Sequence, residues 1–431
     1  MFGQIIPLIF GIRPEFLLFA LTLLGVALFH RYTLWVALIG LTAILAFKFI
    51  FIPSFNLSEH LFGHVSFVDQ ILHKGMRVGE WGTLLNLLGL LIGFSILSRH
   101  FEQSRLPEYL PELLPNDWKG PLVLLITVFI ISSFLDNIAA ALIGGTIALV
   151  VFKHKVHIGY IAAIVAASNA GGSGSVIGDT TTTLMWIEGV SPFNVLHGYI
   201  AALSALAFFS VFASLQQHKY QPIQKDEAPN VVIDWVRVAI VVLILLLTIA
   251  TNVFFDFPAL GVWIAIGMGT LIRKTDWAEA KNAIGGSIFL ISLVTCASLM
   301  PVEELPPASW HTTFSLGFIS AVFDNIPLTK LALEQNGYDW GMLAYAVGFG
   351  GSMIWFGSSA GVAITSKFEE SRSVLKWIIA GWHIIVAYIL GFFILWFLMG
   401  WEPQIIPAKS VRPASTQTMK HSIPIIVSPH S

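Results

Sequence analysis

Phe134-Leu135-Asp136-Asn137-Ile138 and Phe323-Asp324-Asn325-Ile326-Pro327 place the same Asp-Asn pair in two apolar segments that lie far apart in the chain. An ionisable side chain is costly to place in a bilayer, and such residues are rare there and usually line a transport path. Because the arrangement occurs twice, it predicts an internally duplicated membrane protein with polar groups in its interior.

The composition is that of a membrane protein. Of 431 residues, 56% are apolar and only 11% are charged, whereas ordinary soluble domains carry about 25% charged residues. The net charge of −2 leaves no basic excess for nucleic acid, and the lone Cys296 excludes an intramolecular disulfide and a cysteine-based metal site. Met1 to Phe10 carry no basic n-region, so we expect no cleavable signal peptide. We expect a multi-pass protein of a bacterial inner (plasma) membrane.

Apolar stretches of the length that spans a bilayer, roughly 20 residues, predict a series of membrane helices. They lie at 14–32, 34–52, 82–98, 195–214, 233–255, 257–273, 283–300 and 375–400.

Four further apolar segments are interrupted. Segments 121–152 and 313–335 break at the Asp-Asn pairs, which predicts two short helices joined at a polar tip, a re-entrant hairpin. Segments 158–187 and 342–366 break at runs of Gly and Ser, which predicts discontinuous membrane helices. Secondary transporters hold their ions and substrates where such helices break.

The order of these segments is the same in both halves of the chain. Each half crosses the membrane an odd number of times, so the second copy must be inverted. The predicted fold is an all-α polytopic membrane protein of two inverted repeats, each with three scaffold helices, a re-entrant hairpin, a broken helix and a final helix. We expect the first repeat at 1–214, a cytoplasmic linker at 215–231, the second repeat at 232–401 and a disordered tail at 402–431. An additional partial crossing within residues 1–12 stays open.

The distribution of Lys and Arg orients this arrangement. One side collects about twice as many basic residues as the other, and the larger group includes Arg99, Lys153 and Lys274. The positive-inside rule makes that side cytoplasmic. The first hairpin would then enter from the cytoplasm and the second from the exterior.

The first broken helix carries the densest group of polar residues, Asn169 followed by Asp179, Thr180 and Thr181. A carboxylate, hydroxyl groups and the carbonyls of unwound backbone are the ligands that a small hard cation prefers. Alternatively, Asp179 or a threonine caps the helical segment that follows, because N-cap positions favour these residue types.

The second broken helix has Ser358 and Ser359 at the corresponding place and no acidic residue. We therefore expect an asymmetric site, with the stronger negative charge supplied by the first half. Gly350 and Gly351 in the same segment are interpreted as packing residues, as in other membrane helices.

The Asp-Asn pairs themselves have two interpretations. Asx side chains favour turns, so Asn137 and Asn325 either form the hairpin tips or ligate an ion. A buried carboxylate costs several kcal/mol unless it is paired, protonated or bound to a cation. We therefore predict that Asp136, Asp179 and Asp324 bind a transported metal cation, and that protons compete for the same carboxylates.

Two other charged residues lie near these segments. Glu80 precedes Trp81 at a predicted helix start, where acidic residues are favoured, so we interpret it as a cap or interface residue. Lys330 lies just past the second hairpin tip, and no Lys or Arg falls within the predicted broken helices.

A family resemblance rests on three motifs, Ser168-Asn169-Ala170-Gly171-Gly172, Ile177-Gly178-Asp179-Thr180-Thr181-Thr182 and Val322-Phe323-Asp324-Asn325-Ile326-Pro327-Leu328. They resemble the NhaD-type sodium/proton antiporters, part of the wider ion transporter superfamily that also holds citrate, dicarboxylate and arsenite carriers. The resemblance extends from about 80 to 400. It implies a scaffold domain, a mobile transport domain that contains the hairpins and broken helices, and a homodimer.

The chain departs from this pattern at the first Asp-Asn pair. Ile138-Ala139-Ala140 follows it, whereas Ile-Pro follows the second pair, so we expect the first hairpin tip to have a different shape.

We expect a cation/proton antiporter that exchanges sodium (or lithium) for protons, with a sodium-coupled carrier of di- or tricarboxylates such as citrate as the alternative. A citrate site should offer positive charge or several helix N-termini to the anion. The chain has no paired His or Cys metal motif and no nucleophile elbow, so we do not expect an enzyme. Sodium and protons as transported ions, and no cofactor, complete the expectation, with the lipid bilayer and small inorganic cations as partners.

Overall fold

The computed structural model describes residues 8, 11–29, 31–73, 76–225 and 231–406. This part of the chain is all-α, and six of its helices are long and apolar enough to cross a membrane. The predicted all-α polytopic membrane fold is confirmed. The possible crossing within residues 1–12 falls largely outside the described residues, which exclude 1–7 and 9–10.

The first half of the chain contains the predicted helices together with short connecting ones. They are α1 (Pro14–Leu28), α2 (Thr33–Phe51), α3 (Leu57–Phe62), α4 (Phe67–Leu72), α5 (Trp81–Gln103), α6 (Leu106–Leu113), α7 (Lys119–Ser132), α8 (Asn137–Val151), α9 (Ile158–Gly172), α10 (Thr180–Ile187), α11 (Phe193–Leu196) and α12 (Gly198–Tyr220).

The second half has the same order of long helices, hairpin, broken helix and final helix. Its elements are α13 (Trp235–Phe255), α14 (Pro258–Ile272), α15 (Trp277–Ser298), η2 (Val302–Glu304), α16 (Trp310–Ser320), α17 (Asn325–Gln335), α18 (Trp340–Gly350), α19 (Ser359–Thr365), η3 (Glu369–Ser371), α20 (Val374–Ala380) and α21 (Trp382–Met399).

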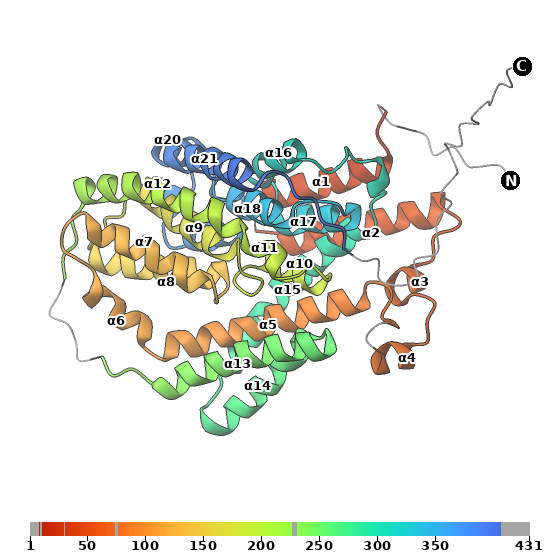
Figure 1. Cartoon of the computed structure of the whole chain (residues 1–431), viewed down its shortest axis with the longest axis horizontal. Helices are drawn as coiled ribbons and strands as arrows, with labels where there is room; N and C mark the ends of the chain where they lie inside the picture. Colours follow the sequence, from red (N-terminus) through yellow and green to blue (C-terminus); the bar gives the residue numbers. More distant parts are fainter. Residues whose placement is uncertain (1–7, 9–10, 30, 74–75, 226–230, 407–431) are drawn as a thin grey trace, which may run out of the picture.

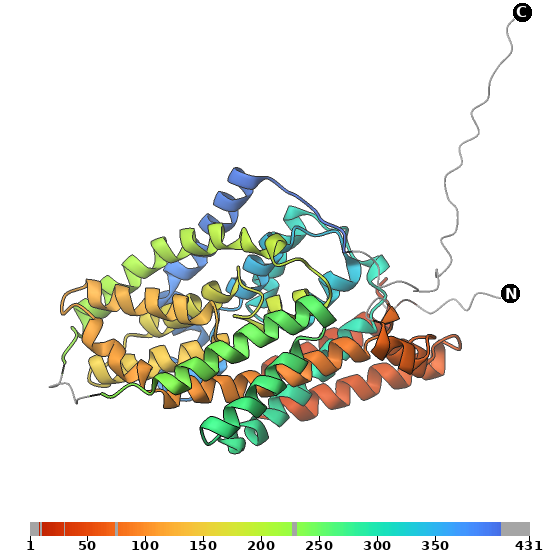
Figure 2. The same cartoon turned by 60° about the horizontal axis from the view of Figure 1, so that its bottom comes forward.

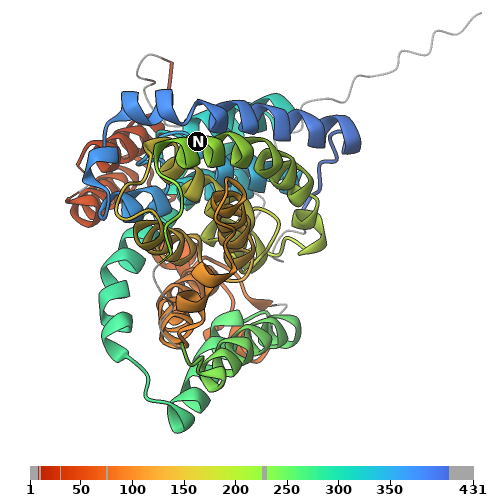
Figure 3. The same ribbon diagram turned by 90° about the vertical axis from the view of Figure 1, so that its left-hand side faces the viewer.

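The helices form two layers (Figures 1 and 2). In one layer, long helices pack side by side in the order α1, α2, α15, α5, α14 and α13. The other layer holds the two hairpins (α7–α8 and α16–α17), the broken helices (α9–α10 and α18–α19) and the final helices α12 and α21. Figure 3 shows α13 and α14 at the lower edge of the molecule and α21 at the upper edge.

Corresponding helices of the two halves make reciprocal contacts with the opposite half. The second long helix of each half contacts the third long helix of the other, α2 on α15 and α14 on α5. Likewise, the second helix of each hairpin contacts the second segment of the other half's broken helix, α8 on α19 and α17 on α10. The polar tips and breaks of both halves are thereby brought together near the centre of the molecule.

The two hairpin tips have the same backbone. Asp136 has φ −52° and ψ 140°, and Asp324 has φ −54° and ψ 139°. The expected difference in tip shape is therefore wrong. Pro327 lies in the first turn of α17, where the proline ring and missing N–H are tolerated, so its presence does not alter the turn before it.

Corresponding contacts also fasten each hairpin to the broken helix of its own half. Ser132 Oγ donates to Ser168 O at 2.6 Å, and in the second half Ser320 Oγ donates to Val347 O at 2.7 Å. At Gly350 a side chain is excluded, because an added Cβ would lie 2.2 Å from Gly317 O of the neighbouring hairpin. Close helix packing explains this glycine, as interpreted from the sequence.

Backbone carbonyls freed by the first break are satisfied by side chains. Ser133 Oγ and Tyr199 OH both donate to Gly171 O, at 3.1 and 3.2 Å, and Thr183 Oγ1 donates to Val176 O at 3.0 Å. Such partners are required where a helix unwinds at membrane depth. The hydroxyl-rich sequence around the break therefore has a structural role beside any ligand role.

The linker and tail differ in extent from the predicted boundaries. Helix α12 continues to Tyr220, so the connection to α13 starts later than 215, and its residues 226–230 lie outside the described part. At the other end, Gln404 N donates to Tyr338 O at 2.9 Å and Ile406 N donates to Asn336 Oδ1 at 3.0 Å. Residues 402–406 thus pack on the loop after α17, and 407–431 are outside the described residues.

Candidate functional site

Four helix N-termini meet at the centre of the fold. Asp136 precedes α8, Asp179 precedes α10, Asp324 precedes α17 and Ser358 precedes α19. Asp179 and Ser358 share an extended backbone, with φ −146° and −140°. The acidic residue of the first half and the serine of the second half therefore occupy corresponding places.

Asp136 and Asp324 cap the hairpin helices that follow them. Asp136 Oδ2 accepts a hydrogen bond from Ile138 N at 3.2 Å, and Asp324 Oδ1 accepts one from Ile326 N at 3.0 Å. Ser359 Oγ approaches the other oxygen of Asp324 at 3.5 Å. Capping occupies one oxygen of each carboxylate, so each retains an oxygen for a further ligand.

Asn137 is not merely a turn residue. Its Nδ2 donates to Asp179 Oδ1 at 2.9 Å and to Asn169 Oδ1 at 3.0 Å, and all three side chains are buried. The hairpin tip and the break of the adjacent helix are thus held together by side chains that the sequence assigned to the site.

Asn169 continues this network into the second half. Its Nδ2 donates to Ser352 Oγ at 2.9 Å and to Ser358 Oγ at 3.1 Å. Ser352 was not among the predicted site residues; it lies at the end of α18, and nothing in its local sequence distinguishes it from other small residues. A network of two asparagines and two serines thereby links the broken helices.

Asp179 is the least satisfied acidic group of the site. Its side chain does not cap α10 and its residue is only 1% exposed. Within the described part of the chain, Oδ2 and Thr181 Oγ1 make no hydrogen bond of ordinary geometry, although the hydroxyl and backbone N–H of Thr181 lie close to this carboxylate. The nearest feature of the second half is Gly348, where an added Cβ would lie 3.5 Å from Oδ2.

Asp179 lies within electrostatic range of the two other predicted acidic ligands, but the three carboxylates do not meet at metal-ligand distance in this structure. Asp179 interacts electrostatically with both Asp136 and Asp324. Like charges at short range in a low-dielectric interior repel strongly. A cation or proton bound at Asp179 would therefore relieve repulsion with both hairpin carboxylates.

Two cavities reach these residues from different helices. One, of about 350 Å³, is lined by Asp136, Thr180 and Ser359 and extends to Arg99 and Glu279. A smaller one, of about 210 Å³, is lined by Asp324, Ser358 and Ser359. Because both touch Ser359, the carboxylates of the two hairpins are approached through adjoining spaces.

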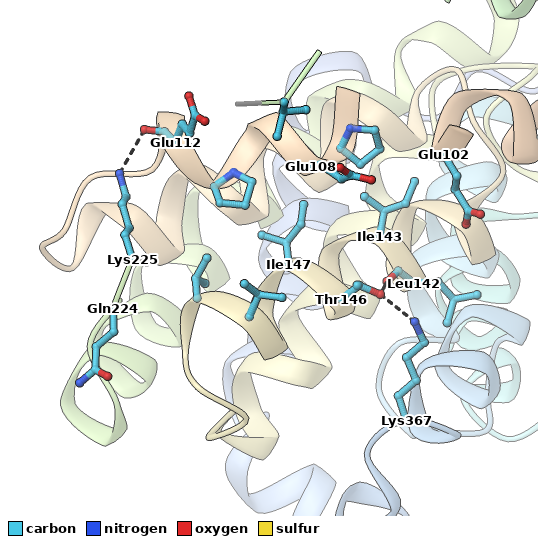
Figure 4. A pocket seen from close by; sticks show the side chains of 15 residues that line it. Glu102, Glu108, Glu112, Leu142, Ile143, Thr146, Ile147, Gln224, Lys225 and Lys367 are labelled. Atoms are coloured by element: carbon cyan, nitrogen blue, oxygen red, sulfur yellow. Dashed lines mark hydrogen bonds between the residues drawn. The ribbon is translucent and has the colours of Figure 1, made fainter. Parts of the chain in front are cut away.

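A larger cavity, of about 610 Å³, adjoins the first one, since Glu102 and Leu142 line both. Figure 4 shows Lys367 reaching Thr146 Oγ1, at 2.7 Å, and Lys225 reaching the backbone oxygen of Glu112, at 3.1 Å. We call this end of the molecule the Arg99 end. From the Arg99 end, these two adjoining cavities lead to Asp136.

Not every predicted residue takes part in these contacts. Asn325 is buried beside Asp324, but no side-chain bond from it to the rest of the site is described. Thr180 approaches Asp179 Oδ1 only at 3.5 Å, although it lines the first cavity.

A charged cluster lies beyond the site, at the opposite end from Arg99. Lys330 is fully buried and contacts Glu80 Oε2 and Glu334 Oε1, each at 2.8 Å, and Glu188. Of the two interpretations of Glu80, a cap or an interface residue, the cap is wrong, because the side chain makes no cap hydrogen bond and instead accepts from Lys330. Sequence reasoning missed this cluster because its members come from distant segments.

Comparison with known proteins identifies the family to which this chain belongs. Residues 16–340 match the family model CitMHS, which is described as a citrate transporter. The chain belongs to this CitMHS family. The matched range contains both hairpins and the whole first broken helix, whereas Ser352, Ser358 and Ser359 of the second broken helix lie beyond it.

Among curated proteins, this CitMHS member is similar to two bacterial proteins named Na(+)/H(+) antiporter NhaD. The protein of Alkalimonas amylolytica is 26% identical over 319 residues, covering 58% of this chain and 64% of that protein. The protein of Vibrio cholerae is 27% identical over 312 residues, with 58% and 64% covered. Sodium/proton antiporter 1 of Arabidopsis thaliana is 22% identical over 311 residues, with 61% and 54% covered.

These matches confirm the resemblance to NhaD-type members of the ion transporter superfamily. The matched region spans less than two thirds of each of these three relatives. Together with the apolar helices, family membership identifies a multi-pass membrane protein.

Proposed function

We propose that this protein exchanges sodium (or lithium) for protons by alternating access. Asp136, Asp179 and Asp324 bind the cation and protons in turn, with Thr180 and Ser359 as further oxygen ligands. Oxygen ligands suit a small hard cation. The names of the bacterial and plant relatives support this choice of ions.

The observation that carries the proposal is the state of Asp179. A carboxylate that is 1% exposed, with one oxygen bonded to Asn137 and the other without a hydrogen bond of ordinary geometry in the described structure, needs a counter-charge. A bound cation or a proton supplies it. Either one satisfies the same oxygen, which is the condition for exchange of one against the other.

The second candidate is a sodium-coupled citrate-like carrier, favoured by the description of the matching family. Its anion would use the helix N-termini at the centre of the fold. However, Asp136 and Asp324 already occupy the N-termini of α8 and α17. Lys330 is held by three glutamates, so its charge is not free for an anion. The cation therefore fits better.

Alternating access follows from the proposed inversion of the two halves. Inverted repeats with broken helices are the architecture of secondary transporters, and the reciprocal packing of corresponding helices supports the repeat. The Lys and Arg distribution supports placing the Arg99 end in the cytoplasm. We also propose that the long-helix layer acts as scaffold, that the hairpin layer moves, and that the protein is a homodimer.

The test is transport by purified protein in sealed vesicles with an imposed proton gradient. We expect sodium to dissipate the gradient when no organic anion is present. Accumulation of labelled citrate that depends on sodium, without proton movement, would overturn the antiporter in favour of the carrier.

A further inference from the structure

We propose that Lys330 and its three glutamates form a gate that closes the transport path at the end opposite Arg99. This gate cluster is defined as Lys330, Glu80, Glu188 and Glu334. The inference deepens the proposed function and rests on it, because a gate has meaning only if access to the site alternates.

The gate cluster joins three separate elements. Glu80 stands directly before α5, Glu188 directly follows α10, and Lys330 and Glu334 lie one turn apart on α17. The Lys330 ammonium contacts a carboxylate oxygen of each glutamate and is fully buried. One ammonium thus faces three carboxylates, so Lys330 holds together acidic groups that would otherwise repel one another, and each contact is a charged hydrogen bond.

Buried apolar side chains, which we call the apolar plug, lie within two helical turns of the gate cluster along α5 and α17. Leu87 of α5, Val294 of α15 and Ile326 of α17 belong to one hydrophobic cluster and are 0%, 0% and 1% exposed. A cavity of about 380 Å³ approaches from outside and is lined by Trp81 and Glu188, at the gate cluster. Among the described residues, Asp136, Asp179 and Asp324 do not line this cavity.

At the Arg99 end, the residues that correspond to the gate cluster in the other half leave the path open. Glu80 and Asp276 are corresponding residues, since each directly precedes the Trp that begins the third long helix of its half. Counting along α8 and α17 from their aspartates, Leu142 corresponds to Lys330 and Thr146 to Glu334. Counting along the broken helices from Asp179 and Ser358, Lys367 corresponds to Glu188.

These corresponding residues do not form a cluster. Lys367 contacts Thr146, whereas Asp276 is 3.1 Å from Arg99 Nε. Leu142 lines the cavities of about 350 and 610 Å³ that lead to Asp136. One end of the path is therefore sealed by charge pairing over an apolar plug, and the other end is hollow.

The position of Glu80 makes it the contact that must break. Glu80 adjoins α5 of the long-helix layer, whereas Glu188, Lys330 and Glu334 belong to the hairpin and broken-helix layer. Movement of one layer past the other would separate Lys330 from Glu80 and leave its other two contacts intact. Lys330 is thus a positioning residue that sets which end of the path is closed.

The experiment measures access to the plug. In a Cys296→Ala background, which removes the single native cysteine, Val294→Cys reports on the sealed end. Ser98→Cys, its counterpart on α5, reports on the hollow end because it lines the cavity near Arg99. The full-length protein is purified in detergent and labelled with a hydrophilic maleimide. In detergent the reagent reaches both ends of the protein, so the test does not depend on the orientation in a membrane.

We expect Ser98→Cys to be labelled at least tenfold faster than Val294→Cys. Adding Glu80→Gln should raise the labelling rate of Val294→Cys about tenfold, because the variant loses a charged hydrogen bond to Lys330. Glu304→Gln, which neutralises a glutamate paired with Arg13 outside the gate cluster, should leave it unchanged. Equal rates for the two reporters, or no effect of Glu80→Gln in protein with unchanged melting temperature, would overturn the gate.

The readout separates this inference from the proposed function. Labelling needs neither sodium nor proton transport, so the gate is overturned by its own result even when exchange is observed. Conversely, absence of sodium/proton exchange alongside the expected labelling pattern would refute the choice of ions and leave the gate standing.

Discussion

Asn137 donates one hydrogen bond to Asp179, at 2.9 Å, and so joins the tip of the first hairpin to the break of the adjacent helix. The same amide group also contacts Asn169, which bonds to Ser358 of the second half. The position of the Asp179 carboxylate is therefore set by both halves. Movement of either half relative to the other would change how this acid is held.

Asp179→Asn should abolish sodium-driven proton movement in sealed vesicles, because the amide can neither release a proton nor carry the charge that holds a cation. The variant should be at least as stable as the parent in sodium-free buffer, since a buried charge is removed. Asp117→Asn, at an exposed position before α7, is the matched control and should transport normally. Normal exchange by Asp179→Asn would contradict the assignment.

Asn169→Ala should lower stability and sodium affinity together. It removes the bonds to Ser352, Ser358 and Asn137 and leaves buried polar groups unsatisfied, which costs about 1–3 kcal/mol. Melting curves with and without sodium measure both effects. A variant that melts lower but keeps the full sodium-induced shift would show that Asn169 is structural only. Asn194→Ala, an amide in α11, serves as the control.

Two glycines of α18 should separate ligand binding from packing. At Gly348 an alanine methyl would lie 3.5 Å from Asp179 Oδ2, an ordinary contact, so Gly348→Ala should fold well but bind sodium more weakly. At Gly350 the methyl would lie 2.2 Å from Gly317 O, so Gly350→Ala should be destabilised. Sodium titration and melting temperature of both variants test this. Unchanged sodium affinity in Gly348→Ala would place the ion elsewhere.

The residues that correspond to the gate at the Arg99 end should approach each other when that end closes. Asp276 and Lys367 carry opposite charges, and Lys367 lines the same cavity as Leu142, so the two charged residues are expected to pair in that conformation. With Asp276→Cys and Lys367→Cys in the Cys296→Ala background, a short bifunctional maleimide should cross-link them more when Glu80→Gln is added. Mass spectrometry of the linked peptides measures the yield. A yield that does not respond to Glu80→Gln would speak against this pairing.

The positions of hairpins and breaks could be predicted from the sequence because they depend on local features. An apolar run that is interrupted by Asp-Asn or by Gly and Ser reveals where a membrane helix stops. The tip residues then follow, since Asp136 and Asp324 cap the next helix through bonds to a backbone only two residues away.

Features that depend on distant partners could not be predicted in this way. Helix α12 extends past 214 because Gln217 is buried, accepting from His157 N at 2.7 Å and donating to Lys155 O at 3.1 Å. The pairing of Lys330 with Glu80 joins residues 250 positions apart. Neither a polar residue in a helix nor an acid at a helix start reveals such a partner.

The most direct test of the central claim is sodium binding by purified protein at several pH values, measured by calorimetry in buffers of different ionisation enthalpy. If protons and sodium compete for the carboxylates, sodium affinity should fall as pH falls, by up to about tenfold per pH unit for one competing proton. Each bound sodium should release protons to the buffer. Asp179→Asn should lose both effects. Sodium binding that is independent of pH and releases no proton would contradict the account.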